Sequence, residues 1–212
     1  DITSTLKATY SLGTWNNTSE GRSQSFLTNA ATGAPVYSGV VSIDGNKYNL
    51  GASDLTMSNE SLRQMMQTFS LKSNTKERFD YELSLSQYRY LQDDNRAPST
   101  YANGLSGGAG SNTDGAGTGW TAFASKGTYR PDGMRGKHIY DFGYQQDSYT
   151  LSQIKSNITT NWTSGTAGTL SSQVAGNTRL QSLWGQDTWR VAKDWTAVLG
   201  LRGEKWTAFN GL

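Results

Sequence analysis

The stretch TRLQSLWGQDTWRVAKDWTAVLGLRGEKWTA, residues Thr178–Ala208, decides the fold of this chain. It predicts two long strands joined by a tight turn at Val191–Asp194. In the second strand apolar and polar side chains alternate. Trp195, Ala197, Leu199 and Leu201 share one face, and Thr196, Gly200, Arg202 and Glu204 share the other, with Val198 as the apolar exception. Alternation over about ten residues is the pattern and the length of a tilted β-strand that crosses a bilayer. The tryptophan at the turn end lies where an aromatic girdle would lie.

The same design recurs upstream. Strands are expected at Ile2–Leu12, Met66–Ser73, Phe79 to about Tyr88, Trp120–Tyr129 and Lys137 to about Tyr149. In four of the five, apolar and aromatic side chains keep to one face and polar side chains to the other. The face assignment of the Trp120–Tyr129 strand stays open. With the closing hairpin, seven antiparallel strands are expected.

The predicted connections alternate in length along the chain. The long ones are about 13–63, 92–119 and 152–176, and the short turns are about 74–77, 131–136 and 191–194. Short turns on one side and long loops on the other are typical of outer-membrane barrels. We therefore expect an all-β fold that forms part of a transmembrane antiparallel β-barrel, with extracellular long loops and periplasmic turns.

Two local signals fall inside the first long loop. Asp44-Gly45 between two apolar runs predicts a tight β-hairpin. Ser58–Ser61 followed by Leu62, Met65 and Met66 predicts a short helix. In the second long loop, the glycine-rich segment Gly107–Gly119 predicts a flexible loop without a phosphate-binding role.

Composition excludes several classes of protein. The chain has 212 residues, 34% of them hydrophobic, and no apolar run long enough for a transmembrane helix. Cysteine is absent, so no disulfide or thiolate metal site is expected. The net charge of +2 is too small to indicate a nucleic-acid partner. No signal peptide opens the sequence, so we expect either a mature segment or a fragment.

Few side chains point to chemistry. His138 is the only histidine, which argues against an enzyme and against a histidine-based metal site. Asp93, Asp94 and Asp114 could offer oxygen ligands to Ca²⁺, but they lack EF-hand spacing, and a solvated acidic loop is the favoured interpretation. No cofactor or metal site is expected. Arg202 and Glu204 share the lumen face, and they are interpreted as members of cross-strand ion pairs that hold strand register.

Three segments carry a resemblance to a known family. In the closing hairpin Trp184, Gln186, Asp187, Trp189, Gly200, Arg202 and Glu204 stand at the positions of the recurring aromatic-x-Gln-Asp-x-Trp, turn, Gly-x-Arg pattern. That pattern resembles the hairpins of TonB-dependent outer-membrane receptors. LRQMMQTFSLKSNTKERFDYELSLSQYRYLQDDNRAP and TGWTAFASKGTYRPDG are similar to further blocks of the same family.

The resemblance implies a barrel of about 22 strands, of which this chain would hold about a third, and an N-terminal plug. It implies a transporter in the outer membrane of a Gram-negative bacterium that imports a scarce nutrient, such as a ferric siderophore, with energy from TonB. The expected partners are outer-membrane lipid and lipopolysaccharide, TonB through a plug not seen here, the nutrient, and the remaining barrel segments or chains.

A ligand would meet loop tips and upper positions of the lumen, where aromatic side chains and a fixed cation suit a bulky chelate or organic nutrient. The candidate ligand-binding residues are Trp15, Tyr88, Tyr90, Arg96, Tyr101 and Tyr144. Two alternatives stay open: a passive porin, and a secreted structural or adhesive β-protein. No repeat of solenoid type is found in the sequence.

Overall fold

A computed structural model describes residues 1–52 and 54–212; Ser53, inside the first expected long loop, lies outside the described residues. The all-β prediction is confirmed, because 67% of residues lie in strands and 3% in helix. The elements are β1 (Leu6–Arg22), β2 (Gly39–Ile43), β3 (Asn46–Leu50), β4 (Met57–Ser73), β5 (Phe79–Pro98), α1 (Tyr101–Ser106), β6 (Gly110–Asp114), β7 (Gly119–Tyr129), β8 (His138–Ile158), β9 (Leu170–Ala192) and β10 (Trp195–Phe209).

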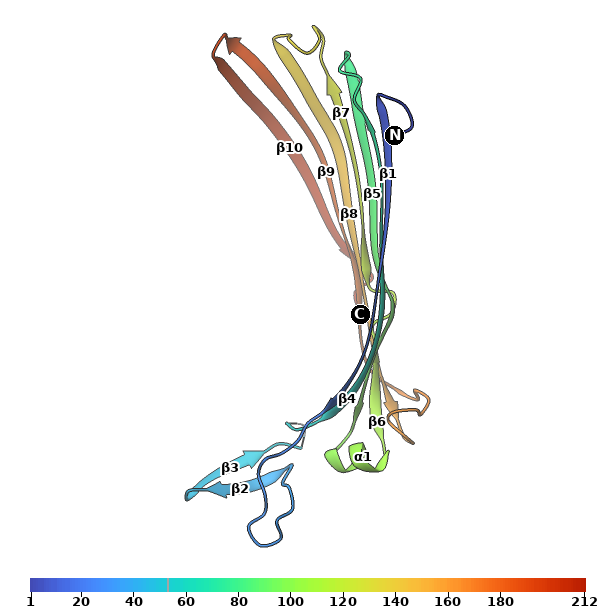
Figure 1. The fold of residues 1–212 in the computed structure, drawn as a ribbon, viewed down its shortest axis with the longest axis vertical. Coiled ribbons are helices and arrows are strands. Elements are labelled where there is room, and N and C mark those ends of the chain that lie inside the picture. The colour runs from blue at the N-terminus through green and yellow to red at the C-terminus, as the bar shows by residue number, and fades with distance from the viewer. Residues whose placement is uncertain (53) are drawn as a thin grey trace.

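One large antiparallel sheet contains all of these strands except β2 and β3, which form a separate hairpin. Its eight strands occupy seven positions, because β6 and β7 follow one another in the same place between β5 and β8. The order of positions is β1, β4, β5, β6 with β7, β8, β9 and β10. Figure 1 shows this sheet as a long, bowed layer of strands.

The strand pairing places the expected apolar faces on one side of the sheet. Tyr10 pairs with Phe69, Phe69 with Leu85, and Leu85 with Phe123, so these side chains share a face across four positions. On β8, β9 and β10, Tyr140 pairs with Asp187 and Asp187 with Leu199, so these residues and those that alternate with them lie on the same face. We call this side the apolar face and the opposite side, which bears Lys72, Glu82 and Lys126, the polar face. The register also settles β7, with Phe123 on the apolar face and Trp120 on the polar face.

The apolar face ends part of the way along the sheet, on the side towards the long connections. It extends from the short turns to a belt of glutamines, in which Gln67 donates to Gln87 at 2.9 Å and Gln181 donates to Gln146 at 3.1 Å. From Phe79 at the turn to the belt, β5 covers about nine residues, close to the length of a tilted transmembrane strand.

The two ends of the sheet differ. The short connections between β4 and β5, β7 and β8, and β9 and β10 lie together at the top of Figure 1. The β2–β3 hairpin, α1 and the β8–β9 connection lie at the other end. The expected hairpin turn is confirmed: Asp44 and Gly45 have φ of 50° and 83°, and a tight turn of this type requires positive φ at both central residues.

Several predicted boundaries are wrong in the same direction. Strand β1 continues to Arg22 and β4 begins at Met57, so both strands include residues of the loop expected at 13–63. Strand β5 continues to Pro98, and β6 lies within the loop expected at 92–119. Strands β8 and β9 extend into the loop expected at 152–176. These extensions are mostly polar, and their apolar side chains, such as Trp15, Leu62 and Ile154, are isolated. Their sequences therefore lack the regular alternation that indicates a strand, although backbone pairing holds them.

Two local predictions are also corrected. The helix expected from Ser58–Ser61 does not form, because these residues pair with β1 and β5 as part of β4. The expected flexible loop Gly107–Gly119 instead begins as the left-handed cap of α1, at Gly107 with φ 73°, and then contributes β6. No helix among the described residues has the length and the apolar character needed to cross a membrane.

The sheet has little core of its own. Among the described residues only Met57, Ile158 and Trp162 are buried apolar side chains, and all three lie at the loop end. On the apolar face, large side chains such as Leu201 are exposed, at 83% for that residue. Strands β1 and β10 form the two edges, and neither pairs with a further strand of the described chain. An exposed apolar face of this extent is typical of a surface that contacts lipid or another protein.

Candidate functional site

The polar face near the short turns carries a lattice of ion pairs. Lys72 contacts Glu82 at 3.0 Å, and the pairing row continues from Glu82 to Lys126 on the next strand. Lys126 contacts Asp141 at 3.1 Å. On β10, Arg202 contacts Glu204 at 2.6 Å, and it also donates to Ser182 on β9 at 2.9 Å. Within the described chain the expected cross-strand ion pair is therefore not formed: the Arg202–Glu204 pair lies within β10, and Arg202 reaches the neighbouring strand through its hydrogen bond to Ser182.

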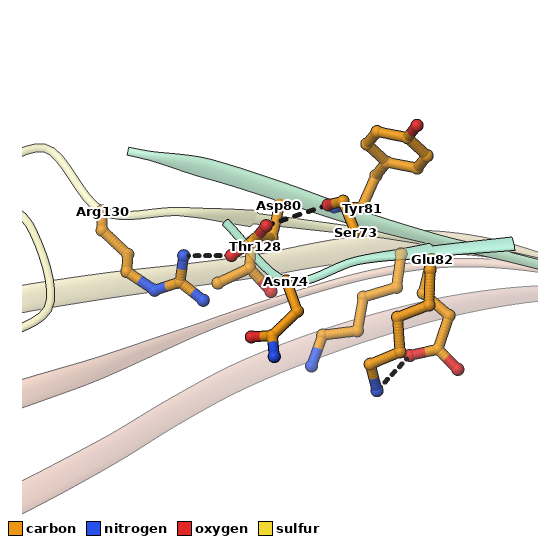
Figure 2. Close-up of a pocket in the computed structure, with 9 residues that line it drawn as sticks. Ser73, Asn74, Asp80, Tyr81, Glu82, Thr128 and Arg130 are labelled. Atoms are coloured by element: carbon orange, nitrogen blue, oxygen red, sulfur yellow. Dashed lines mark hydrogen bonds and ion pairs between the residues drawn. The ribbon is translucent and has the colours of Figure 1, made fainter. Parts of the chain in front are cut away.

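Asp80 anchors the turn end of this lattice (Figure 2). Its carboxylate accepts hydrogen bonds from Ser73 Oγ at 2.9 Å and from Arg130 Nη1 at 2.8 Å. It also accepts one from the backbone N–H of Thr75 at 2.7 Å. Both ends of the Arg130–Asp80 pair are nearly buried. The carboxylate therefore ties the turn after β4 to the turn after β7. Because its oxygens are occupied by these donors, we assign this group a structural role.

Beyond this lattice the polar face becomes aromatic. Tyr88 stacks on Trp120 with ring centroids 4.4 Å apart and planes at 17°, and it meets Tyr90 edge-on at 5.6 Å. Trp120 pairs in register with Tyr149 on β8. On the other side, Gln64 accepts a hydrogen bond from the Tyr88 hydroxyl and pairs with both Tyr90 and Trp15. We call Trp15, Tyr88, Tyr90, Trp120 and Tyr149 the aromatic strip.

The aromatic strip brings together three of the six side chains expected to bind ligand: Trp15, Tyr88 and Tyr90. Their rings come from β1 and β5, and Gln64 on β4 lies between them. Sequence reasoning missed Trp120 and Tyr149. Trp120 does begin a predicted strand, which is a signal in the sequence. The faces of that strand could not be assigned from its own residues, so the side on which Trp120 lies was unknown.

The other three candidates lie elsewhere. Tyr144 is on the apolar face, where its hydroxyl donates to Gln146 at 3.0 Å and accepts from Gln181 at 2.8 Å. Arg96 is at the loop end and donates to the carbonyl of Gly165 at 2.8 Å. Tyr101 lies on α1 and stacks on Tyr37 with ring centroids 3.4 Å apart. A hydrogen bond with Tyr37 is the main cause that raises the pKa of Tyr101 to about 12.

Trp162 organises the loop end. Its side chain is 1% exposed, and its indole N–H donates to the carbonyl of Gly104 at 3.2 Å. Its backbone N–H donates to Gly108 at 2.9 Å, and the guanidinium of Arg22 lies 5.4 Å from its ring centroid. A Cβ on Gly110 would stand 2.6 Å from that of Trp162, so the close approach requires glycine there. We call Arg22, Met57, Ile158 and Trp162, with these glycines, the loop cluster.

The acidic residues near the loop end do not form a cation site. Asp94 and Asp114 are paired strand residues, not the solvated loop that the sequence indicated. Asp94 accepts hydrogen bonds from Asn112 at 3.2 Å and from Gln92 at 3.1 Å. Within the described residues no group of three or more acidic or histidine side chains could hold a metal ion. Burial, with the nearby carboxylates of Glu60, Asp114 and Asp94, raises the pKa of Asp93.

Asp93→Asn is expected to stabilise the protein near neutral pH. A carboxyl whose pKa is higher in the folded than in the unfolded state lowers stability above its folded pKa, and this penalty disappears below its unfolded pKa. The urea midpoint of the variant should therefore exceed that of the wild type at about pH 7, and the difference should shrink towards about pH 3. The matched change Asp94→Asn removes the charge from a hydrogen-bonded carboxylate and should destabilise. Equal midpoints for the two variants would contradict this account of Asp93.

Comparison of the chain with protein-family models, with curated proteins and with solved structures found no match. The function must therefore be inferred from the geometry of the sheet and its two faces.

Proposed function

We propose that this chain forms part of the wall of an outer-membrane TonB-dependent transporter, with its apolar face towards lipid and its polar face towards the lumen. The observation that carries the proposal is the division of the sheet into two faces over the same residues. The apolar face presents exposed aromatic and aliphatic side chains for about nine residues, and the opposite face over that length carries ion pairs. Such a division suits a barrel wall between lipid and water.

The ends of the apolar face support the same orientation. His138, Tyr140 and Trp189 stack near the short turns, with His138 centroid distances of 5.7 Å to Tyr140 and 5.9 Å to Trp189. Rings with polar edges in this position suit the aromatic girdle of a membrane interface. At the other limit, the glutamine belt supplies amide groups that suit the opposite interface.

The TonB-dependent class rests on the resemblance of the closing hairpin, of which Trp184, Gln186, Asp187 and Trp189 lie on β9. A passive porin would have the same two faces but would need no energy source. If cells that carry the whole protein stop taking up the nutrient when TonB is deleted, the transporter is supported. If uptake of the nutrient continues, the porin is supported. A secreted adhesive β-protein would not insert in the membrane at all.

Cysteine labelling tests the orientation directly, because the chain has no cysteine of its own. In the whole protein that contains this chain, Lys47→Cys on β3 and Met134→Cys in the turn before β8 place single thiols at opposite ends of the sheet. A membrane-impermeant maleimide should label Lys47→Cys on intact cells and Met134→Cys only after the outer membrane is opened. Equal labelling of the two thiols on intact cells, or recovery of the protein outside the membrane fraction, would overturn the proposal.

A further inference from the structure

The aromatic strip lies on the polar face, which the proposed function assigns to the lumen. We propose that this strip binds a neutral oligosaccharide, so that the nutrient is a glycan and not an anionic ferric chelate. The inference rests on the proposed function for the direction in which the strip faces. It rests on the charges and rings of the strip itself for the class of ligand.

Charge is the first argument. In the described chain, no lysine or arginine shares a pairing row with the aromatic strip on the polar face. Nearer the short turns, Lys72 is held by Glu82, Lys126 by Asp141 and Arg202 by Glu204. Lys7, which pairs with Lys72, is on the same face but three pairing rows from the strip. A ferric chelate with several negative charges would therefore meet no unmatched cation at the strip.

The carboxylates around the strip add to this discrimination. Asp147 occupies the position on β8 two residues before Tyr149, on the same face, and accepts from Gln145 at 2.7 Å. Towards the loop end, burial and, after it, the nearby carboxylate of Glu60 raise the pKa of Asp93. The strip is thus bordered by negative charge on both sides, which repels an anion and leaves a neutral ligand unaffected.

The rings provide the second argument. Trp15 is 50% exposed, Trp120 48% and Tyr149 39%, so each keeps open aromatic surface although its neighbours hold it. The stack of Tyr88 on Trp120 and the bond from Tyr88 to Gln64 fix two of the rings in place. Rigid aromatic surface binds the C–H faces of sugar rings with little loss of side-chain entropy.

Hydrogen-bonding groups flank these rings. The amide of Gln64 lies in the pairing row of Tyr90 and Trp15. The hydroxyl groups of Thr68 and Ser86 and the carboxylate of Asp147 lie in the row next to that of Tyr88 and Trp120 on the polar face. Amides and hydroxyl groups both donate and accept, which suits the hydroxyl groups of a sugar. The combination of open rings and neutral polar groups matches a polyhydroxylated ligand better than a purely apolar one.

The length of the strip sets the size of the ligand. It crosses five strand positions, from β1 to β8, which at about 4.8 Å between strands spans about 19 Å. A single sugar would cover only part of this distance. The ligand is therefore an oligosaccharide that lies across the strands.

Binding to the whole purified protein tests the proposal. A panel of neutral hexasaccharides built from glucose, xylose or mannose is titrated while tryptophan fluorescence is followed, and an iron tris-catecholate complex is titrated as the anionic probe. At least one hexasaccharide should bind with a fluorescence change, and Trp120→Ala should weaken its binding by about tenfold or more.

Trp184→Ala is the matched control, because Trp184 lies on the same face but over Gly143, away from the strip. It should leave hexasaccharide affinity unchanged. If no hexasaccharide binds, if Trp120→Ala and Trp184→Ala weaken binding equally, or if the iron complex binds in a Trp120-dependent manner, the glycan proposal is overturned. A photoreactive amino acid in place of Trp120 that crosslinks to another segment of the protein would also overturn it, because that segment would then cover the strip.

The cysteine labelling described above separates the two levels of inference. Correct labelling of Lys47→Cys and Met134→Cys combined with failure of every hexasaccharide rejects the glycan and keeps the transporter. Incorrect labelling rejects the transporter and, with it, the glycan proposal.

Discussion

Leu83→Arg is expected to block assembly of the protein in the outer membrane. Leu83 lies on the apolar face at the middle of the segment from Phe79 to Gln87, and it pairs with Leu71 and Ser125. In the proposed orientation its side chain is near the bilayer midplane, where an arginine costs about 2–4 kcal/mol. The amount of heat-modifiable, folded protein in the membrane fraction should fall sharply. Leu199→Arg, on the apolar face of β10, should act in the same way.

Ser84→Arg is the matched control for Leu83→Arg. Ser84 is the next residue along β5, on the polar face, where it pairs with Ser70 and Ala124. An arginine there would extend into the water of the proposed lumen and should be tolerated, as should Thr196→Arg on β10. Equal loss of assembly for Leu83→Arg and Ser84→Arg would refute the assignment of the two faces.

Trp162→Ala is expected to cost the loop cluster about 3–5 kcal/mol, the usual range for removing a buried large aromatic side chain. The indole is almost fully buried, and its loss removes the bond to Gly104 and the contact with Arg22. Because Trp162 lies outside the apolar face, we expect normal membrane assembly. Hydrogen exchange should accelerate at Gly104–Gly110 and at residues 159–169, while amides of β5 near the short turns keep their protection.

Phe26→Ala provides the comparison for Trp162→Ala. Phe26 is an aromatic residue of the β1–β2 connection, and it is 91% exposed. Its removal should leave hydrogen exchange at the loop cluster unchanged. Failure of Trp162→Ala to assemble, or unchanged exchange at Gly104–Gly110, would contradict the local role of Trp162.

The parts of the fold that could be predicted are those in which burial of one face imposes a pattern. Leu83 and Leu85 alternate with Ser84 and Ser86, and this alternation indicated both the strand and its faces. Beyond the glutamine belt that constraint ends. Residues such as Ser58–Ser61 form a strand through backbone pairing and a few polar side-chain contacts, without an alternating apolar pattern. The local helix signal therefore outweighed the correct assignment.

The candidate site could be predicted only in part, for a related reason. Tyr88 and Tyr90 are two residues apart on one strand, so their common face follows from sequence. The addition of Trp120 and Tyr149 depends on register between strands that are far apart in the chain. Tyr144 was misplaced because an aromatic ring with a hydroxyl group suits either face. Arg96 was chosen for its charge, but its guanidinium group donates hydrogen bonds to neighbouring backbone carbonyl groups.

The direction of the two edge strands has a consequence for how a ring of strands could close. Both β1 and β10 run from the short-turn end to the loop end, because seven alternating positions begin and end with the same sense. In a closed antiparallel ring the sense must alternate without a break, so this sheet requires an odd number of additional strands. Copies of the chain placed edge to edge, with their short turns at the same end, would always bring β10 beside a parallel β1. Self-association in that orientation therefore cannot give an all-antiparallel ring, whatever the number of copies, and the proposed barrel would need additional strands of a different origin.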